Sequence, residues 1–151
     1  MKVFRRLSSG LSCGDSIPFY HDGTYHLFFL SVPANTVRYP ERTRNTWQHV
    51  ISKDLVNWEE LPPVLLPGEE PAIDADGCWT GSVLYADHKY HIFYTGYHIN
   101  AQFPQTICHA TSDDSITWVK DEKSPYIVPD TRYYESIDWR DPYIFYNEDD
   151  G

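Results

Sequence analysis

The chain has 151 residues, of which 41% are hydrophobic and 16% aromatic, so it can bury a core and is not a disordered acidic tail. Its 12 Lys and Arg against 22 Asp and Glu give a net charge of −10. This charge argues against nucleic acid and anionic membrane surfaces as partners, because both are bound by basic patches. No window approaches the roughly 18 apolar residues of a membrane span, and the length alone suggests one domain.

The chain begins with the basic run M-K-V-F-R-R and lacks the apolar stretch of roughly 7–15 residues that a secretory signal contains. As written, the protein is therefore expected to be cytoplasmic. Cys13, Cys78 and Cys108 are odd in number and lack C-x-x-C spacing, so neither a disulfide framework nor a zinc site is predicted. Each cysteine is expected to be a small buried apolar residue. No cofactor and no metal are predicted.

Short runs of aromatic and β-branched residues, bounded by turn residues, predict β-strands along the whole chain. The predicted strands cover residues 25–30, 83–85, 90–95, 107–111 and 143–146. The pairs Asp22-Gly23 and Asp87-His88 are predicted hairpin turns. Helical periodicity is scarce, so the pattern predicts an all-β protein built from successive hairpins.

Two sequence patterns repeat along the chain. H-x-x-S-x-D-x-x-x-W covers residues 49–58 and again 109–118, and Y-H-L-F-F at 25–29 matches Y-H-I-F-Y at 90–94. A third unit is expected to begin at Asp141, where D-P-Y-I-F-Y resembles D-S-I-P-F-Y from Asp15. The copies of the first pattern are 60 residues apart and those of the second 65 residues apart. Repeats of about this length, with about four short strands each, are typical of β-propeller blades. The alternative is a coincidence of Trp and Asp spacing in an aromatic-rich chain.

The repeated S-x-D-x-x-x-W pattern has a structural interpretation. Its Ser and Asp can accept hydrogen bonds from turn amides, and its Trp can pack between blades. His49 and His109 recur at equivalent positions instead of forming a cluster, which favours a structural role over metal binding.

Two carboxylates are the candidates for chemistry. The first strand of each propeller blade lines the central axis, so Asp15 and Asp141 are expected to meet in one axial funnel. Trp79, at the matching place of the second blade, would form an aromatic wall between them, and such a site suits a neutral polyhydroxylated ligand. Each Asp alone is also compatible with a turn opener, and Arg140 beside Asp141 with a surface ion pair of little energetic consequence.

Four ordered motifs resemble glycoside hydrolase family 32, the invertases, inulinases and levanases. W-Q-H-V-I-S-K-D-L-V-N-W from Trp47 resembles the family's W-G-H-x-x-S-x-D-L-x-x-W, and D-G-C-W-T-G-S from Asp76 resembles D-G-C-F-S-G-S. W-R-D-P from Trp139 resembles F-R-D-P. G-D-S-I-P from Gly14, with the Y-H-L-F-F run that follows, resembles the N-D-P-N-G box and the Y-H-L-F-Y strand. The match runs from about residue 14 to the C-terminus.

The resemblance implies a five-bladed β-propeller, of which this chain covers about the first two and a half blades. It implies a retaining glycoside hydrolase that acts on β-fructosides of the sucrose, inulin or levan type. Asp15 would be the nucleophile and Asp141 the transition-state stabiliser. The implied substrate-binding residues are Arg140, Trp79, Thr80 and Trp47.

The family's general acid is a Glu in an E-C motif after the R-D-P motif, and no Glu up to Gly151 has that context. Retaining hydrolysis needs a nucleophile and a proton donor about 5–5.5 Å apart. Residues 1–151 are therefore expected to be a partial, N-terminal portion of the glycoside hydrolase propeller domain, inactive alone. The expected partner is an oligosaccharide or disaccharide substrate, and the chain alone is expected to self-associate through exposed blade edges.

Gly14 replaces the family's Asn before the nucleophile, and Trp79-Thr80 replaces its Phe-Ser pair, so the motifs leave the specific sugar open. Two other functions also stay open. One is a non-catalytic carbohydrate-binding propeller, and the other is a glycosidase of the related arabinanase and xylosidase type.

Overall fold

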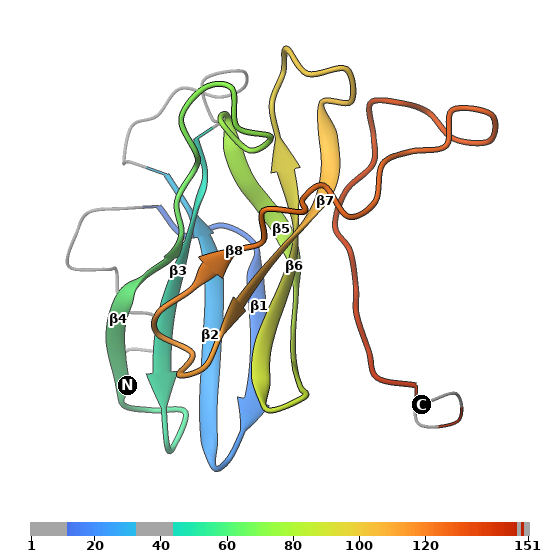
Figure 1. The fold of residues 1–151 in the computed structure, drawn as a ribbon. Coiled ribbons are helices and arrows are strands. Elements are labelled where there is room, and N and C mark those ends of the chain that lie inside the picture. Colours follow the sequence, from blue (N-terminus) through green and yellow to red (C-terminus); the bar gives the residue numbers. More distant parts are fainter. Residues whose placement is uncertain (1–11, 33–43, 148, 150–151) are drawn as a thin grey trace.

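The computed structural model describes residues 12–32, 44–147 and 149, which form two four-stranded sheets (Figure 1). The first sheet contains β1 (Ser16–His21), β2 (Thr24–Ser31), β3 (Thr46–Ser52) and β4 (Trp58–Leu65) in that order. The second contains β5 (Gly77–Ala86), β6 (Lys89–Tyr97), β7 (Gln105–Ser112) and β8 (Val119–Lys120). No helix occurs in these ranges, and so none that is long and apolar enough to cross a membrane. The basic residues 1–6, on which the expected cytoplasmic location rests, lie outside the described residues.

Each sheet is an antiparallel meander, as expected of a propeller blade. Four of the predicted strands lie inside β2, β5, β6 and β7. Both predicted turns join neighbouring strands in two residues, Asp22-Gly23 with φ of 44° and 70° and Asp87-His88 with φ of 49° and 62°. Positive φ at both positions is what the twist of a two-residue hairpin requires.

The fifth predicted strand, at 143–146, is wrong for this structure, which has no strand between residues 141 and 147. A strand is defined by ladder hydrogen bonds to a neighbour, and this segment pairs with no strand among the described residues. Its Ile144 amide donates to the Ser82 hydroxyl of β5 at 2.9 Å, and the segment then continues toward the C-terminal end (Figure 1).

The hydrophobic core lies where the two sheets pack together. Ile17, Phe28 and Trp47 of the first sheet join Ile92 and Tyr94 of the second in one buried cluster. Trp118, the second Trp of the repeated pattern, meets the Phe28 ring edge-on with centroids 6.2 Å apart. A Trp of the repeat therefore packs between the blades, as predicted.

The three cysteines differ in burial. Cys78 and Cys108 are fully buried in the second blade, as predicted. Cys13 is exposed, so the expectation of burial was wrong for it. It precedes β1, on a stretch where the neighbouring Gly14 and Asp15 are exposed as well.

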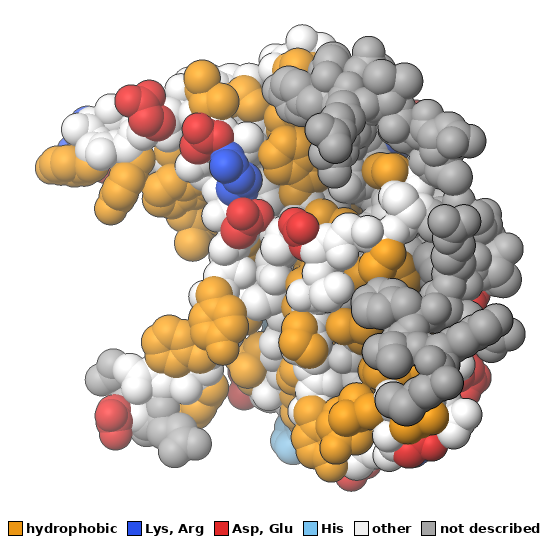
Figure 2. Space-filling model, turned by 180° about the vertical axis from the view of Figure 1, so that it is seen from behind, with side chains coloured by type: hydrophobic (Ala, Val, Ile, Leu, Met, Phe, Trp, Pro, Cys, Tyr) orange, Lys and Arg blue, Asp and Glu red, His pale blue; other side chains and the backbone are white. Residues whose placement is uncertain are grey.

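Large apolar side chains remain exposed toward the C-terminal end of the chain. Tyr133, Tyr143 and Phe145 are 75%, 84% and 69% exposed. Figure 2 shows hydrophobic side chains on the walls of a deep notch in the surface of the molecule. Isolated exposed apolar residues are ordinary, but a concentration of large ones marks a surface suited to contact with protein.

The repeated Ser-x-Asp pattern closes the same turn in both blades. The Asp54 carboxylate accepts hydrogen bonds from the amides of Val56 and Asn57, and the Asp114 carboxylate from those of Ile116 and Thr117. These bonds stabilise the ionised carboxylates, so the pKa of Asp54 lies well below its ordinary range.

The turn at Asp114 is expected to make stability depend on pH. Hydrogen bonds from Thr117 and Ile116 lower the pKa of Asp114 to about 2 in the folded chain, against about 3.9 in an unfolded one. Its stabilising effect is full above the unfolded pKa and is lost between about pH 4 and pH 2. Asp114→Asn should therefore lessen the fall of the urea midpoint over that interval. Asp113→Asn, which alters an exposed carboxylate facing Lys89, is the control, and equal behaviour of the two variants would contradict the assignment.

The repeated histidines lie inside the blades. His49 shares a hydrogen bond of 2.9 Å with His26, and His109 one of 3.0 Å with His91. Burial and the neighbouring His26 lower the pKa of His49 to about 3, so it is neutral at pH 7. Within the ranges that the structure describes, no three His, Cys, Asp or Glu side chains are grouped as a metal site would require.

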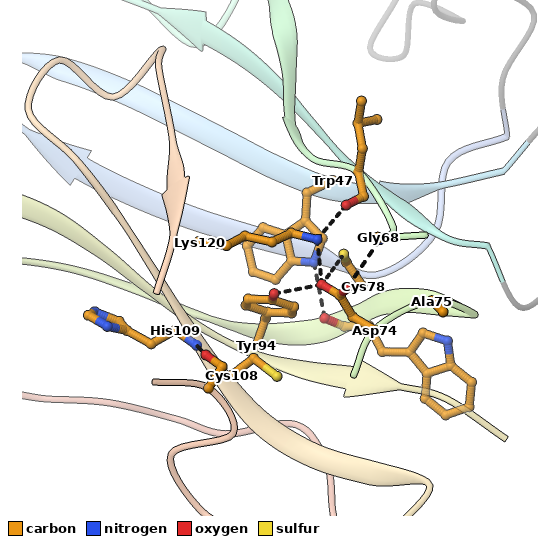
Figure 3. A network of polar contacts seen from close by, with 12 residues as sticks. Trp47, Gly68, Asp74, Ala75, Cys78, Tyr94, Cys108, His109 and Lys120 are labelled. Carbon is orange, nitrogen blue, oxygen red and sulfur yellow. Dashed lines mark hydrogen bonds and ion pairs between the residues drawn. The ribbon is translucent and has the colours of Figure 1, made fainter. Parts of the chain in front are cut away.

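A buried carboxylate ties the two ends of the second blade together. Asp74 is 2% exposed and accepts hydrogen bonds from the Tyr94 hydroxyl at 2.7 Å and from Lys120 Nζ (Figure 3). Lys120 also donates to the carbonyl of Leu66 at 2.6 Å. Burial acts to raise the pKa of Asp74, but the hydrogen bond and charge of Lys120, with the hydrogen bonds from Tyr94 and the Gly68 amide, together lower it. The connection before β5 is thereby fixed to β8.

Candidate active site

A cavity of about 240 Å³ lies where the chain enters β1 and β5. It gathers five of the six side chains that the motifs single out, although they come from three distant parts of the sequence. These five are Asp15, Trp79, Thr80, Arg140 and Asp141, and Gly14, Leu30 and Asn45 complete the lining.

Asp15 is held by the backbone of the neighbouring strand. The Gly14 amide donates to the carbonyl of Leu30 at 2.7 Å, and the Leu30 amide donates to the carbonyl of Asp15 at 3.0 Å. The Asp15 side chain is exposed, and the Thr80 hydroxyl donates to its Oδ2 at 2.5 Å. One carboxylate oxygen is thus oriented by the second blade and the other is left for a ligand.

Thr80 reaches Asp15 because it is the extra residue of a β-bulge. Trp79 pairs with Thr95 and Gly81 with Tyr94, so Thr80 has no partner of its own on β6. A bulge redirects the side chain that it carries and is common beside active sites. A Cβ on Gly81 would lie 2.0 Å from the carbonyl oxygen of Phe93, so the bulge is compatible only with glycine at this position.

Asp141 adopts the left-handed backbone conformation, with φ of 60°. Its amide donates to the Thr95 hydroxyl at 2.8 Å, and its carboxylate lies 3.8 Å from Arg140 Nε. Partial burial raises the pKa of Asp141, the charge of Arg140 opposes this, and the charge of Asp15 adds to it. The two carboxylates therefore influence each other across 126 residues of sequence, as the propeller prediction required.

Arg140 is oriented by two further groups. Its Nη1 donates to the Asp138 carboxylate and, at 3.3 Å, to the Gln105 side-chain oxygen. The guanidinium therefore lies at the edge of the cavity. Its side chain is 41% exposed and both carboxylates are more exposed still, so these ion pairs orient Arg140 and contribute little to stability.

The two tryptophans of the site play different parts. Trp79 lines the cavity, and its ring stacks on Tyr97 with centroids 4.2 Å apart. Trp47 is fully buried, and its indole N–H donates to the carbonyl of Trp79 at 3.0 Å. Trp47 thus lies outside the lining and supports the backbone of the residue that forms the wall.

Two lining residues and one supporting residue are not among the site residues predicted from the sequence. Leu30 and Asn45 line the cavity. Thr95 does not line it, but hydrogen bonds join its hydroxyl to the Thr80 carbonyl and the Asp141 amide, which belong to lining residues. Leu30 and Thr95 sit in strand patterns indistinguishable from those of core residues, and only the register of the sheets shows which of them face the cavity.

The arrangement suits the chemistry of a neutral, hydroxyl-rich ligand. Two carboxylates and a guanidinium offer acceptors and donors for hydroxyl groups, and the Trp79 ring offers an apolar face. An exposed carboxylate oxygen on Asp15 is free of the Thr80 hydrogen bond and is a candidate nucleophile.

Comparison with known proteins agrees with this geometry. Residues 15–151 match the model of the "Glycosyl hydrolases family 32 N-terminal domain". The chain is 36% identical over 141 residues to "Beta-fructofuranosidase, insoluble isoenzyme CWINV6" of Arabidopsis thaliana, a match covering 89% of this chain and 24% of that protein. It is 36% identical over 129 residues to a fructan 1-exohydrolase of Aegilops speltoides, with 83% and 21% covered.

Solved structures agree as well. The chain resembles the GH32 β-fructofuranosidase BmSUC1 of Bombyx mori with a TM-score of 0.71 and 30% identity, covering 91% of this chain and 28% of that one. A mutant of the same enzyme has been solved in complex with sucrose. These neighbours are five-bladed β-propellers, which confirms the predicted fold class. The chain spans about a quarter of the length of the curated relatives it matches.

Proposed function

Because the chain belongs to glycosyl hydrolases family 32, we propose that the protein is a retaining glycoside hydrolase acting on β-fructosides. The curated relatives include a β-fructofuranosidase and a fructan 1-exohydrolase, which supports sucrose-type or fructan substrates. The observation that carries the proposal is the meeting of Asp15 and Asp141 in one cavity, with Arg140 beside them in the lining.

In this proposal Asp15 is the nucleophile. Its free oxygen attacks the anomeric carbon of the fructosyl unit, the glycosidic bond breaks, and the leaving oxygen takes a proton from a general acid. The same acid, now deprotonated, takes a proton from water as the water attacks the anomeric carbon of the fructosyl-enzyme, which releases fructose and restores the Asp15 carboxylate. We assign the general acid to a Glu in the E-C motif that follows R-D-P in the family, and residues 1–151 alone are expected to be inactive.

Asp141 and Arg140 are proposed to bind hydroxyl groups of the fructosyl ring. As positive charge develops on the ring, a carboxylate at that place stabilises the transition state more than the bound substrate. Trp79 and Thr80 shape the pocket, and Trp47 contributes to substrate binding through its support of Trp79.

The test is an assay of the complete protein with sucrose, inulin and levan, reading released fructose and the anomer formed first. Release of β-fructose from at least one of them is expected. Sugar binding by calorimetry without turnover would favour the non-catalytic carbohydrate-binding propeller. Turnover of arabinosides or xylosides with inversion would favour the related glycosidases. Either result would replace this proposal.

The acid limb of the pH profile is expected to depend on Arg140. Removing its charge takes away the group that lowers the pKa of Asp141, so that pKa rises further. In Arg140→Gln the acid limb of kcat/KM should therefore move to higher pH, whereas Arg140→Lys, which keeps the charge, should shift it less. An acid limb that moves to lower pH in Arg140→Gln would contradict this role of Arg140. An acid limb at the same pH in the parent, Arg140→Gln and Arg140→Lys would contradict it as well.

Residues 1–151 produced alone are expected to self-associate. The exposed Tyr133, Tyr143 and Phe145 and the unpaired edges of both sheets offer apolar surface and free backbone groups to a second molecule. Sedimentation velocity should detect oligomers at micromolar concentration, and Tyr143→Ser with Phe145→Ser should reduce them. A monodisperse monomer that melts cooperatively would contradict this expectation.

A further inference from the structure

Residues 141–144 are attached to the second blade by side-chain hydroxyls instead of a backbone ladder. The Ser82 hydroxyl donates to the carbonyl of Pro142 at 2.9 Å and accepts from the amide of Ile144 at 2.9 Å. The Thr95 hydroxyl accepts from the amide of Asp141 at 2.8 Å. Two hydroxyls thus make the backbone contacts that a neighbouring strand would otherwise make.

Both hydroxyls are buried and each acts as donor and acceptor at once. Thr95 is 0% exposed, and its hydroxyl proton goes to the carbonyl of Thr80 at 3.1 Å. Ser82 is 5% exposed. A hydroxyl has one proton to donate, so each of these side chains has a fixed orientation and little freedom to rearrange.

Thr80 is the point at which the supports of the two carboxylates meet. Its hydroxyl donates to Asp15 Oδ2, and its carbonyl accepts from the Thr95 hydroxyl. The Thr95 hydroxyl in turn accepts from the Asp141 amide. A short chain of hydrogen bonds therefore joins Asp15 to the backbone of Asp141. The left-handed conformation of Asp141 is unfavourable for a residue with a side chain and persists only where its surroundings fix it.

We propose that Thr95 and Ser82 are positioning residues that hold Asp141 in register with Asp15. The expected effect on kcat rests on the proposed function. The expected effect on the backbone of residues 141–144 rests only on the hydrogen bonds described above. Neither residue lines the cavity, so each acts through Asp141 and not on the substrate.

The first test compares three variants of the complete protein. Thr95→Val keeps the shape of the side chain and removes the hydroxyl, and Thr95→Ser restores it. Thr106→Val makes the same change at another buried threonine, 1% exposed on β7, whose hydroxyl lies near Cys108 Sγ. A misplaced catalytic group costs roughly 10- to 100-fold, so Thr95→Val should lower kcat by that factor with a smaller change in KM. Thr95→Ser and Thr106→Val should stay within a few-fold of the parent.

The second test does not depend on catalysis. Hydrogen exchange read by mass spectrometry on peptides containing residues 141–144 should become faster in Thr95→Val and Ser82→Ala and stay unchanged in Thr106→Val. If the parent hydrolyses no fructoside, the proposed function fails. The hydrogen-exchange rates of residues 141–144 then test the positioning role without any measurement of activity.

Three results would overturn the positioning role. They are parental kcat and parental exchange in Thr95→Val, an equal loss of kcat in Thr95→Val and Thr106→Val, and a failure of Thr95→Ser to restore kcat. Should Thr95→Val not fold, the same exchange measurement on Ser82→Ala tests the role in its place. Faster exchange in Ser82→Ala than in the parent would then support the role, and unchanged exchange would refute it.

Discussion

Asp15→Asn is expected to lower kcat on fructosides by on the order of 10⁴-fold or more in the complete protein, because the amide cannot form the fructosyl-enzyme. The Thr80 hydroxyl can still donate to the remaining side-chain oxygen, so the cavity should keep its shape. Substrate binding measured by calorimetry should therefore change far less than kcat. In Asp15→Ala, which removes the carboxylate and leaves its space empty, added azide should restore turnover of an activated fructoside with inverted configuration.

The matched control for this variant is Asp113→Asn. It removes the same charge from an exposed carboxylate whose partner is Lys89, on the turn after β7. Parental activity is expected for it. Asp15→Asn with parental kcat would show that another group attacks the sugar, and the mechanism proposed for Asp15 would be abandoned.

Gly81→Ala is expected to destabilise the protein by about 3 kcal/mol, the upper part of the range for overpacking. The added methyl would lie 2.0 Å from the carbonyl oxygen of Phe93, which is backbone and cannot turn aside. Relief requires β5 and β6 to separate or the bulge to disappear, and either change moves Thr80 away from Asp15. The variant should therefore lose activity even at temperatures where it stays folded.

Urea unfolding followed by tryptophan fluorescence measures the expected loss. Gly23→Asn is the control, because Gly23 has a φ of 70° that Asn tolerates and an added Cβ meets nothing within 4 Å. Its midpoint should stay close to that of the parent. An unchanged midpoint in Gly81→Ala would mean that the two strands separate at little cost, and the bulge would not be a fixed part of the site.

The features that local chemistry determines were predictable from the sequence. Asp22-Gly23 and Asp87-His88 form the turns expected of them, and the aromatic runs form β2, β5, β6 and β7. The repeat predicted the blades, and the blades brought Asp15 and Asp141 together. The turns and strands were predictable because turn residues and side-chain alternation determine structure over a few residues. The blades were predictable because the same pattern occurs twice in the chain.

Other features depend on contacts that no short pattern encodes. Thr80 points at Asp15 because the register of β5 slips by one residue, and nothing in D-G-C-W-T-G-S specifies a bulge without knowledge of β6. Trp47 was placed among the substrate-binding residues, yet the packing of β3 under β5 buries it completely behind Trp79. Residues 143–146 have the composition of a strand, but a strand also needs a neighbour.

The cavity takes Asp15 from the entry to the first blade, Thr80 from the second and Asp141 from the segment that follows. No single blade contains the site, so under the proposed function catalysis should be lost when the two blades separate. Enzymatic turnover can therefore serve as a reporter of folding. Its loss in rising urea should coincide with the fluorescence transition. A ligand that bridges Asp15 and Asp141 should stabilise the folded protein, because it binds only where the two blades are packed together.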